Sequence, residues 1–441
     1  MKISTYLRKG LIILFWLVAW TALAMFISNS IILVGPLEVL KAFFINMTED
    51  GFWQTVASSL IRIGGGFFVS FILALCMGIL SYRFSLIKEF LEPLIVMVKS
   101  VPVASFVVLL LIWAGADNLA FFISLLIVFP GIYVSTVAGL ESTDSKLLEM
   151  ADTFSLSQWD KARFIYKDAL SPYLKSSLKV NLGMAWKSGV AAEVIALPDF
   201  SLGSRIYMSK IYLDTADLLA WTLAVVLLCF LFEKIVLSLI SWTLDKRAVP
   251  KRQNRQMSGE ILLQEVDLSD ICVSFDGREI ISHMDVHLDA GGIYGLMGES
   301  GRGKTTLLNE IEKRVHHKVS RVFQEDRLLE DYDGLTNVML AAGKMENSEC
   351  QSAMSEILTI DSISSKVRNY SGGMKRRTAI LRAMLNDAPL ILLDEPFTGL
   401  DEETKLKVIE FILKYRKGRT LLLVTHNEED IIALGGKRID W

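Results

Sequence analysis

The chain has 441 residues, of which 52% are hydrophobic and 22% are charged, and its formal net charge is −3. The charged fraction is close to the roughly 25% that is typical of soluble proteins. The mean hydropathy of +0.40, however, is too high for a soluble protein. These values exclude a disordered or fibrous protein, and they are expected when an apolar half is joined to a soluble half. The small net charge gives no reason to expect a nucleic-acid partner. The four cysteines lie far apart without a CxxC pattern, so neither a disulfide framework nor a zinc site is expected.

Six long apolar runs occupy the N-terminal half of the chain. A bilayer core about 30 Å thick needs about 20 apolar residues per helix, so each run predicts one membrane-spanning helix. The first run follows three basic residues and would also suit a signal peptide, but its length favours an uncleaved anchor. The runs cover residues 11–27, 56–80, 94–113, 119–138, 174–197 (the weakest) and 218–244.

The basic residues of the short loops predict the orientation. With the N-terminus inside, only Lys41, Arg205 and Lys210 fall outside, whereas the cytoplasmic loops hold many lysines and arginines. Six spans then return the chain to the cytoplasm, so both termini are expected there.

Arg62, Lys187 and Glu193 are among the charged residues within the predicted spans, where ionisable groups are costly and often functional. Arg62 could either serve such a function or extend to the lipid headgroups. Lys187 and Glu193 lie six residues apart, and therefore about 120° apart around a straight helix. We expect them to meet neighbouring helices or a polar cavity, in a packing or gating role, and not to pair with each other.

The segment 141–172 is too polar to span a membrane, and its composition suits a short amphipathic helix at the membrane surface. Its Glu149-Met150-Ala151 sequence, the break at Ser155 and the closing Pro172 resemble the "EAA" loop of bacterial ABC-importer permeases. That loop forms the coupling helix that docks on the ATPase, which implies a coupling role for Glu149, Ala151 and Ser155. The family usually has glycine at position 155 and Leu-Pro at positions 167–168.

Two further segments resemble nitrate/sulfonate/taurine-type permeases. They are residues 100–115, which contain Ser-Val-Pro and Leu-Leu-Ile-Trp-Ala-Gly, and residues 183–193, with lysine at 187 where arginine is common. The likeness spans most of residues 50–245 and implies an all-α six-helix permease domain over residues 1–245. Residues 246–259 are polar and basic, and they predict a linker at the cytoplasmic membrane face.

A short apolar strand at 292–297 leads into Gly-Glu-Ser-Gly-Arg-Gly-Lys-Thr, which fits the pattern G-x-x-x-x-G-K-[ST]. Glycines let the backbone wrap around phosphates, and the free N–H groups of the following helix favour an anion. Lys304 would add charge at the β- and γ-phosphates, and Thr305 would offer its hydroxyl to Mg²⁺. The predicted ATP contacts in this loop are Gly298, Glu299, Ser300, Gly301, Arg302, Gly303, Lys304, Thr305 and Thr306.

A second predicted buried strand, residues 390–395, ends in Asp394 and Glu395. Next to a phosphate-binding loop, Asp394 is expected to bind Mg²⁺ and Glu395 to activate the attacking water.

Ser371-Gly372-Gly373 opens a basic helix and, with the elements above, resembles the ABC signature, with Tyr370 and Met374 in place of the usual leucine and glutamine. The resemblance covers residues 260–441 and implies an α/β P-loop ATPase domain. The resemblance assigns roles to four further residues. Phe275, 29 residues before Lys304, would stack on the adenine, and Gln324 of the Q-loop would be a ligand of Mg²⁺. Asp401 would belong to the D-loop, and His426 would be the switch histidine.

Only 20 residues separate Lys304 from Gln324, fewer than in most of this family, so part of the small β-subdomain is expected to be missing. The sequence stops at Trp441, which favours a minimal ATPase without a regulatory extension.

The resemblance implies that the signature of one copy acts on ATP bound to another, and a C₂ homodimer with about twelve spans is the simplest assembly. It also implies a bacterial cytoplasmic-membrane importer that receives a small anion, or a vitamin-precursor heterocycle, from an extracytoplasmic binding protein. Two alternatives stay open. Short cytoplasmic loops argue against an exporter half-transporter, and small outside loops argue against a non-transporting membrane ATPase.

Overall fold

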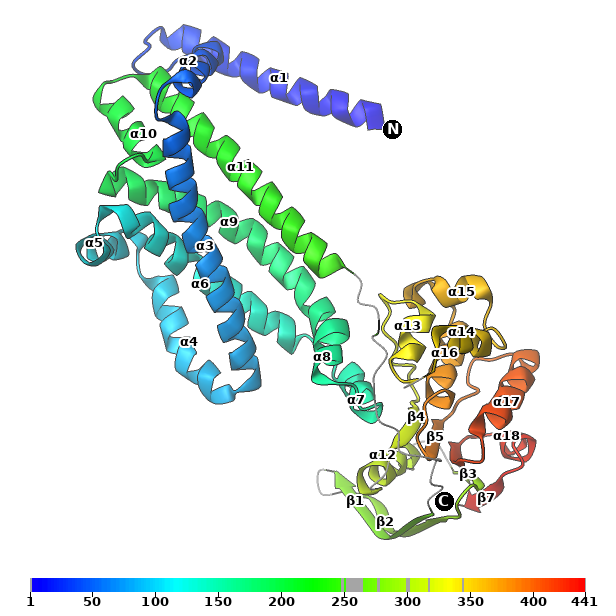
Figure 1. Cartoon of the computed structure of the whole chain (residues 1–441). Coiled ribbons are helices and arrows are strands. Elements are labelled where there is room, and N and C mark those ends of the chain that lie inside the picture. Colours follow the sequence, from blue (N-terminus) through cyan, green and yellow to red (C-terminus); the bar gives the residue numbers. More distant parts are fainter. Residues whose placement is uncertain are drawn as a thin grey trace. The chain divides into compact units, whose positions relative to one another are not determined.

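A computed structural model of the chain describes residues 2–246, 250, 265–275, 278–298, 302–315, 318–342 and 345–440, without the side chains of 2–6, 275, 278 and 440. The chain forms two compact units (Figure 1). The helical unit combines Met1–Ser142 with Ala169–Lys246, and the sheet unit combines Thr143–Asp168 with Arg247–Trp441. The predicted linker 246–259 lies almost entirely outside the described residues.

The helical unit is built from the helices before Ser142 and after Asp168, most of them apolar. They are α1 (Lys2–Ile27), α2 (Pro36–Thr48), α3 (Phe52–Arg83), α4 (Ser85–Ser100), α5 (Val103–Ala114), α6 (Ala116–Glu141), α9 (Lys167–Ala196), α10 (Leu202–Ile211) and α11 (Thr215–Asp245). Among the described residues, α1, α3, α6 and α11 are long and apolar enough to cross a membrane.

Two of the six predicted spans differ in the structure. The run 94–113 is divided between α4 and α5, which meet at an angle of 103°, and the pair counts as at most a fifth span. Pro102 explains the break, because proline disfavours a helical conformation at Val101, which is extended with ψ 130°. The weak run 174–197 lies in α9, which is not among the apolar spans. The count of six is therefore not confirmed.

Glycines allow α3 and α6 to approach closely. A Cβ atom on Gly66 would lie 2.3 Å from the carbonyl oxygen of Phe121, and one on Gly78 would lie 2.7 Å from the side chain of Thr136. Small residues at such contacts are typical of membrane helices, whose association depends on close packing. The glycine-rich stretch around Gly66 is thus part of a helix–helix interface.

The sheet unit begins with the segment 143–168, which forms α7 (Ser145–Thr153), α8 (Gln158–Lys161) and a π-helical turn (Ala162–Tyr166). Two strands, β1 (Val266–Phe275) and β2 (Arg278–Leu288), form an antiparallel sheet, and five form a parallel sheet in the order β4-β5-β6-β3-β7. The parallel strands are β3 (Ile293–Met297), β4 (Val319–Val322), β5 (Leu390–Asp394), β6 (Thr420–Val424) and β7 (Lys437–Asp440).

Helices on both sides cover the parallel sheet (Figure 1). They are α12 (Lys304–Arg314), α16 (Gly372–Met384), α17 (Glu402–Arg416) and α18 (Glu428–Ala433). A separate group of helices lies next to α16 and consists of α13 (Gly334–Met339), α14 (Asn347–Met354) and α15 (Ile360–Ser364), with a 3-10 turn at Val367–Asn369. Alternate residues of β5 enter different apolar clusters: Ile391 and Leu393 one, Leu390 and Leu392 the other. Both faces of the strand are buried, as is typical of parallel sheets.

The described residues between Lys304 and Gln324 form only α12 and β4. The short spacing thus leads from α12 directly to β4, which lies at the end of the parallel sheet next to β5.

Candidate functional site

The predicted nucleotide residues gather at one edge of the parallel sheet. Residues that follow parallel strands meet at the carboxyl edge, which is the usual binding side of such sheets. Gly298 follows β3, Gln324 follows β4, Glu395 follows β5 and His426 follows β6. Strands β5 and β6 pair at Asp394 and Val424, which brings the last two of these positions together.

The phosphate-binding loop connects β3 to α12. Gly303, with φ 95°, adopts a left-handed conformation directly before the helix begins at Lys304, a conformation that glycine adopts most readily. Lys304 is buried, and its Nζ donates to the carbonyl oxygen of Gly298 at 2.6 Å. The lysine thus reaches back to Gly298, the first residue of the motif. Arg302 is exposed and Thr306 half-buried, whereas Glu299, Ser300 and Gly301 lie outside the described residues.

Two of the predicted Mg²⁺ ligands lie next to each other. The Thr305 hydroxyl donates to Oδ2 of Asp394 at 2.9 Å. Asp394 is buried, and this burial raises the pKa of its carboxyl group. A hydroxyl and a carboxylate are oxygen ligands of the kind that Mg²⁺ prefers, so these residues fit the ion.

The side chains of Glu395 and His426 lie in direct contact. His426 Nε2 lies 2.7 Å from Oε1 of Glu395. Glu395 has φ 47°, in the left-handed region, where a non-glycine residue costs of order 1 kcal/mol or more. Its backbone N–H donates to the carbonyl oxygen of Val424. The turn at Glu395 directs its carboxylate towards His426. The histidine can hold this carboxylate in a position from which it could accept a proton from a water molecule.

The other motif residues lie at helix starts or in loops. Ser371 caps α16 by accepting the Met374 N–H at 3.3 Å, and Ser371 and Gly372 are exposed. Asp401 caps α17 by accepting the Thr404 N–H at 2.9 Å. Gln324 is exposed, and the Phe275 side chain lies outside the described residues.

Arg376, on α16, links several of these loops and was not expected from the sequence. It is buried, and it donates to the carbonyl oxygens of Asp394 and Glu395 at 2.6 Å each, of Phe323 at 2.7 Å and of Gln324 at 3.3 Å. A guanidinium has enough donors in one plane to make all these contacts. The basic run after Gly373 was visible, but no sequence rule tells which of its members is buried.

The segment 143–168 docks on the sheet unit through an apolar face. Met150, Ala151, Phe154, Leu156, Phe164 and Ile165 form one cluster with Phe323, Leu329, Tyr332, Leu340 and Ala341. Ion pairs flank this cluster: Glu149 to Arg327 at 2.8 Å, and Lys146 to Glu325 at 2.7 Å. The predicted coupling residues therefore lie beside the loop that contains Gln324.

Ser155 ends the docked helix α7. Its φ is 52°, and its N–H donates to the carbonyl oxygen of Asp152. This is the left-handed conformation that glycine favours after a helix, which explains why a glycine at this position is usual. Serine adopts it at a cost of about 1 kcal/mol.

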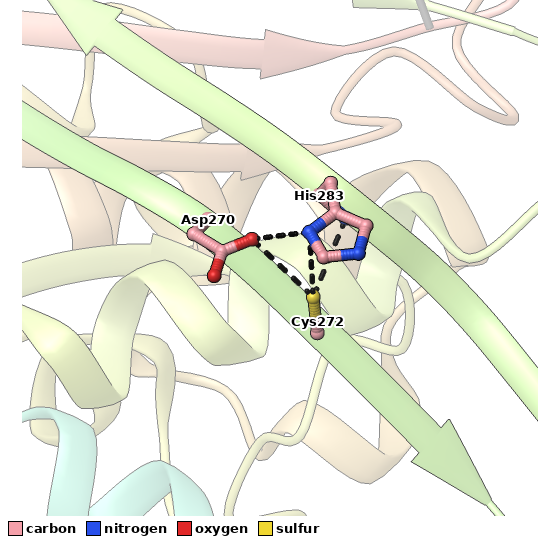
Figure 2. Close-up of side chains that lie close together, drawn as sticks. All are labelled: Asp270, Cys272 and His283. Carbon is pink, nitrogen blue, oxygen red and sulfur yellow. Dashed lines mark hydrogen bonds and ion pairs between the residues drawn. The ribbon is translucent and has the colours of Figure 1, made fainter.

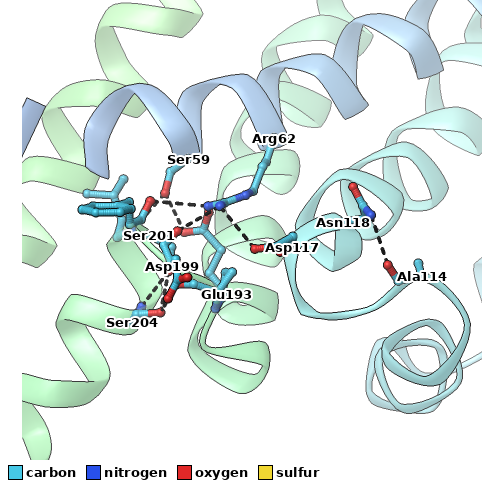
Figure 3. A network of polar contacts seen from close by, with 12 residues as sticks. Ser59, Arg62, Ala114, Asp117, Asn118, Glu193, Asp199, Ser201 and Ser204 are labelled. Atoms are coloured by element: carbon cyan, nitrogen blue, oxygen red, sulfur yellow. Dashed lines mark hydrogen bonds and ion pairs between the residues drawn. The ribbon is translucent and has the colours of Figure 1, made fainter. Parts of the chain in front are cut away.

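A polar network surrounds Arg62 in the helical unit (Figure 3). Arg62 lies 3.7 Å from Glu193 and 3.6 Å from Asp117, and it donates to the carbonyl oxygen of Asp199 at 2.9 Å. Glu193 is fully buried and accepts hydrogen bonds from Ser59 and from the Gly203 N–H. Arg62 and Glu193 therefore meet neighbouring elements, whereas Lys187 is exposed in this unit.

The chain matches two family models. One, described as "ABC transporter", matches residues 281–398, and the other, "Binding-protein-dependent transport system inner membrane component", matches residues 66–248. The first match contains the phosphate-binding loop and the second contains the docked segment.

Three curated relatives align with about two fifths of the chain. The aliphatic sulfonates import ATP-binding protein SsuB 2 of Agrobacterium fabrum is 30% identical, over 40% of this chain and 74% of its own length. The lipoprotein-releasing system ATP-binding protein LolD of Porphyromonas gingivalis is 33% identical, over 40% of this chain and 94% of its own. The thiamine import ATP-binding protein ThiQ of Histophilus somni is 33% identical, over 36% of this chain and 87% of its own.

These matches agree with the site: the relatives share the ATP-binding half, and the inner-membrane model accounts for the apolar half. The chain belongs to the ABC transporter family, as an importer-type membrane permease fused to an ATP-hydrolysing cassette that drives transport.

Proposed function

We propose that the protein imports a small solute that a separate extracytoplasmic binding protein delivers. The observation that carries this proposal is the docked segment 143–168, which packs on the cassette beside Gln324 within a permease of the binding-protein-dependent type. The connection between α6 and α9 is short, whereas an exporter would extend long helices into the cytosol.

ATP hydrolysis is assigned to the carboxyl edge of the sheet. Lys304 and the first turn of α12 bind the phosphates, and Glu395, held by His426, activates water. Thr305 and Asp394, with Gln324, would hold Mg²⁺, which supplies positive charge to the phosphate oxygens when it is bound. Phe275 stacks on the adenine in this proposal.

The working assembly is a C₂ homodimer. The start of α16, where Ser371 and Gly372 are exposed and Gly373 is half-buried, presents helix N-terminal N–H groups that suit the γ-phosphate of ATP on a second copy. In this proposal Asp401, the D-loop residue, also lies at the interface between the two cassettes. The pair of cassettes would have an open state and a closed state, and ATP would favour the closed state. The change between these states would move the membrane helices.

A continuous set of contacts connects hydrolysis to the docked segment. Arg376 holds the carbonyl oxygens of Glu395 and Phe323 together, and Phe323 belongs to the apolar cluster that contains Ala151. A shift of the loop after β5 therefore moves the surface on which α7 rests.

In the membrane, α9 completes the proposed six spans. Its buried face carries polar groups that lower its hydropathy, yet Ser124 of α6 hydrogen-bonds to the Ala185 carbonyl and Trp186 packs against Phe232 of α11. The Arg62–Glu193 pair joins α3 to α9, and we assign it a gating role, since alternating access must break contacts of this kind. With six spans, both termini are cytoplasmic.

The proposed solute is a small anion (sulfonate, taurine or nitrate) or a vitamin-precursor heterocycle. The relatives whose names include a cargo are ATP-binding proteins, and they align with 40% and 36% of this chain. Choice among these solutes rests with the binding protein.

Reconstitution tests the proposal. In proteoliposomes with ATP on the cassette side, the binding protein and its solute on the opposite side should stimulate hydrolysis and solute uptake, and Glu395→Gln should abolish both. Stimulation by solute from the cassette side alone would favour an exporter, and hydrolysis indifferent to any solute would favour a non-transporting ATPase.

A further inference from the structure

The antiparallel sheet of β1 and β2 brings together three side chains of different metal-binding types. Asp270 and Cys272 lie on β1, and His283 lies on β2, with all three exposed. The spacing of the cysteines predicted no zinc site, because the residues are 11 and 13 positions apart and meet only through strand pairing. None of them belongs to the nucleotide site or to the docked segment.

The pairing of the strands is irregular at this place. The register shifts between Leu268 and Ile271 and again between Ile271 and Val273. Asp270 and His283 have φ values of 53° and 46°, a left-handed conformation that is uncommon outside glycine. These two bulged positions turn the aspartate and histidine side chains to the face that carries the cysteine (Figure 2).

The three ligand atoms converge. Asp270 Oδ1 lies 2.5 Å from His283 Nδ1, and Cys272 Sγ lies 3.7 Å from that oxygen and 3.8 Å from that nitrogen. A nucleophilic relay would need the carboxylate on one ring nitrogen and the sulfur on the other. Here both approach Nδ1, so the arrangement does not suit cysteine catalysis.

The same convergence suits a cation. In a tetrahedral zinc site the metal lies about 2.3 Å from sulfur and about 2.0 Å from nitrogen or oxygen, which places sulfur about 3.5 Å from the other ligands. The observed sulfur separations, 3.7 and 3.8 Å, are close to this value. The aspartate–histidine separation must open from 2.5 Å to about 3.3 Å. Both side chains are exposed enough to rotate, at 69% and 79%.

We propose that Asp270, Cys272 and His283 form a binding site for a divalent transition metal, with Zn²⁺ as the best-matched ion. The mixed sulfur, nitrogen and oxygen set is typical of zinc and disfavours Mg²⁺ and Ca²⁺, which take oxygen ligands. Three protein ligands leave the fourth position to water. A bound metal joins β1 to β2 and thereby stabilises the sheet next to the P-loop helix.

Cobalt titration of the purified full-length chain tests the site. Co²⁺ should bind at one equivalent with thiolate-to-cobalt charge-transfer absorption, and Zn²⁺ should remove that absorption. Cys272→Ser should abolish the absorption, and His283→Gln should abolish or shift it. Two matched controls should keep it: Cys76→Ser, an exposed cysteine of the helical unit, and His287→Gln, a second exposed histidine on β2.

Protection of the thiol gives an independent readout. Zn²⁺ should slow alkylation of Cys272, followed by mass spectrometry, and leave alkylation of Cys76 unchanged. Basal ATPase activity checks that each variant is folded, because these residues are exposed and outside the nucleotide site. Absence of thiolate absorption, its persistence in Cys272→Ser, or its loss in either control would overturn the proposal.

Discussion

Replacement of Ala151 by glutamate should uncouple ATP hydrolysis from transport. Ala151 is 0% exposed and shares the docking cluster with Phe323 and Leu329. A glutamate there would place a carboxylate in an apolar interface without a partner. An unpaired buried charge costs several kcal/mol, and a penalty of about 3 kcal/mol weakens docking by roughly 100-fold.

Glu149→Gln is the matched control, two residues away on the same helix. It removes the 2.8 Å ion pair with Arg327, but the glutamate side chain is 63% exposed. An exposed ion pair contributes about 0.2–1 kcal/mol, so docking should weaken by no more than about fivefold. The two variants therefore separate loss of charge pairing from loss of apolar packing.

The assay is solute uptake per ATP hydrolysed in proteoliposomes. Ala151→Glu should hydrolyse ATP near the basal rate, lose stimulation and lose uptake, whereas Glu149→Gln should keep most of both. Ala151→Ser, which is small and neutral, checks that the position tolerates a polar atom. Wild-type uptake per ATP in Ala151→Glu would refute the assignment of this interface as the coupling contact.

Three further predictions follow from single contacts. Glu395→Gln should keep ATP binding, measured with a labelled nucleotide, and nearly abolish phosphate release; substantial residual hydrolysis would contradict its role as base. Cysteines at positions 146 and 325, where the Lys146 Nζ and Glu325 Oε1 atoms now meet at 2.7 Å, should be joined by a bifunctional thiol reagent in the assembled protein, and failure of this cross-link would argue against docking. Gly66→Ala should destabilise the helical unit by about 1–3 kcal/mol, because its Cβ would lie 2.3 Å from a carbonyl oxygen. Gly183→Ala, with nothing within 4 Å, should leave thermal unfolding in detergent almost unchanged.

The cassette was predictable because its motifs are contiguous and follow buried strands. A strand before Gly298 and a helix from Lys304 place a phosphate loop without knowledge of any neighbour. The pairing of Glu395 with His426 then follows from one rule, that parallel strands end at the same edge. The docked helix was predictable for a similar reason, since its apolar residues and its break lie within one short segment.

The membrane half was harder to predict because hydropathy adds up composition and ignores neighbours. The run 94–113 is apolar throughout, yet Pro102 divides it and bends the chain by 103°. The opposite error threatens α9, whose hydropathy is low because it contains polar residues such as Asn181 and Glu193, although both are buried. Only the tertiary structure shows that these polar groups have partners inside the bundle.

Arg376 shows why the decisive positioning residue could not be found in the sequence. Lys375, Arg376 and Arg377 are adjacent and basic, and each has a different partner: the Glu330 carboxylate, the loops after β4 and β5, and the Ile357 carbonyl. Which of these residues points to which partner depends on the rotation of α16 about its axis on the sheet, and no local sequence pattern encodes that rotation. Since Arg376 holds both Phe323 and Glu395 by charge-assisted hydrogen bonds, a shift of either loop strains or breaks bonds of the guanidinium that also holds the other. A conservative Arg376→Lys substitution has too few donors for both loops. It should therefore lower the stimulation of hydrolysis by solute more than it lowers ATP binding.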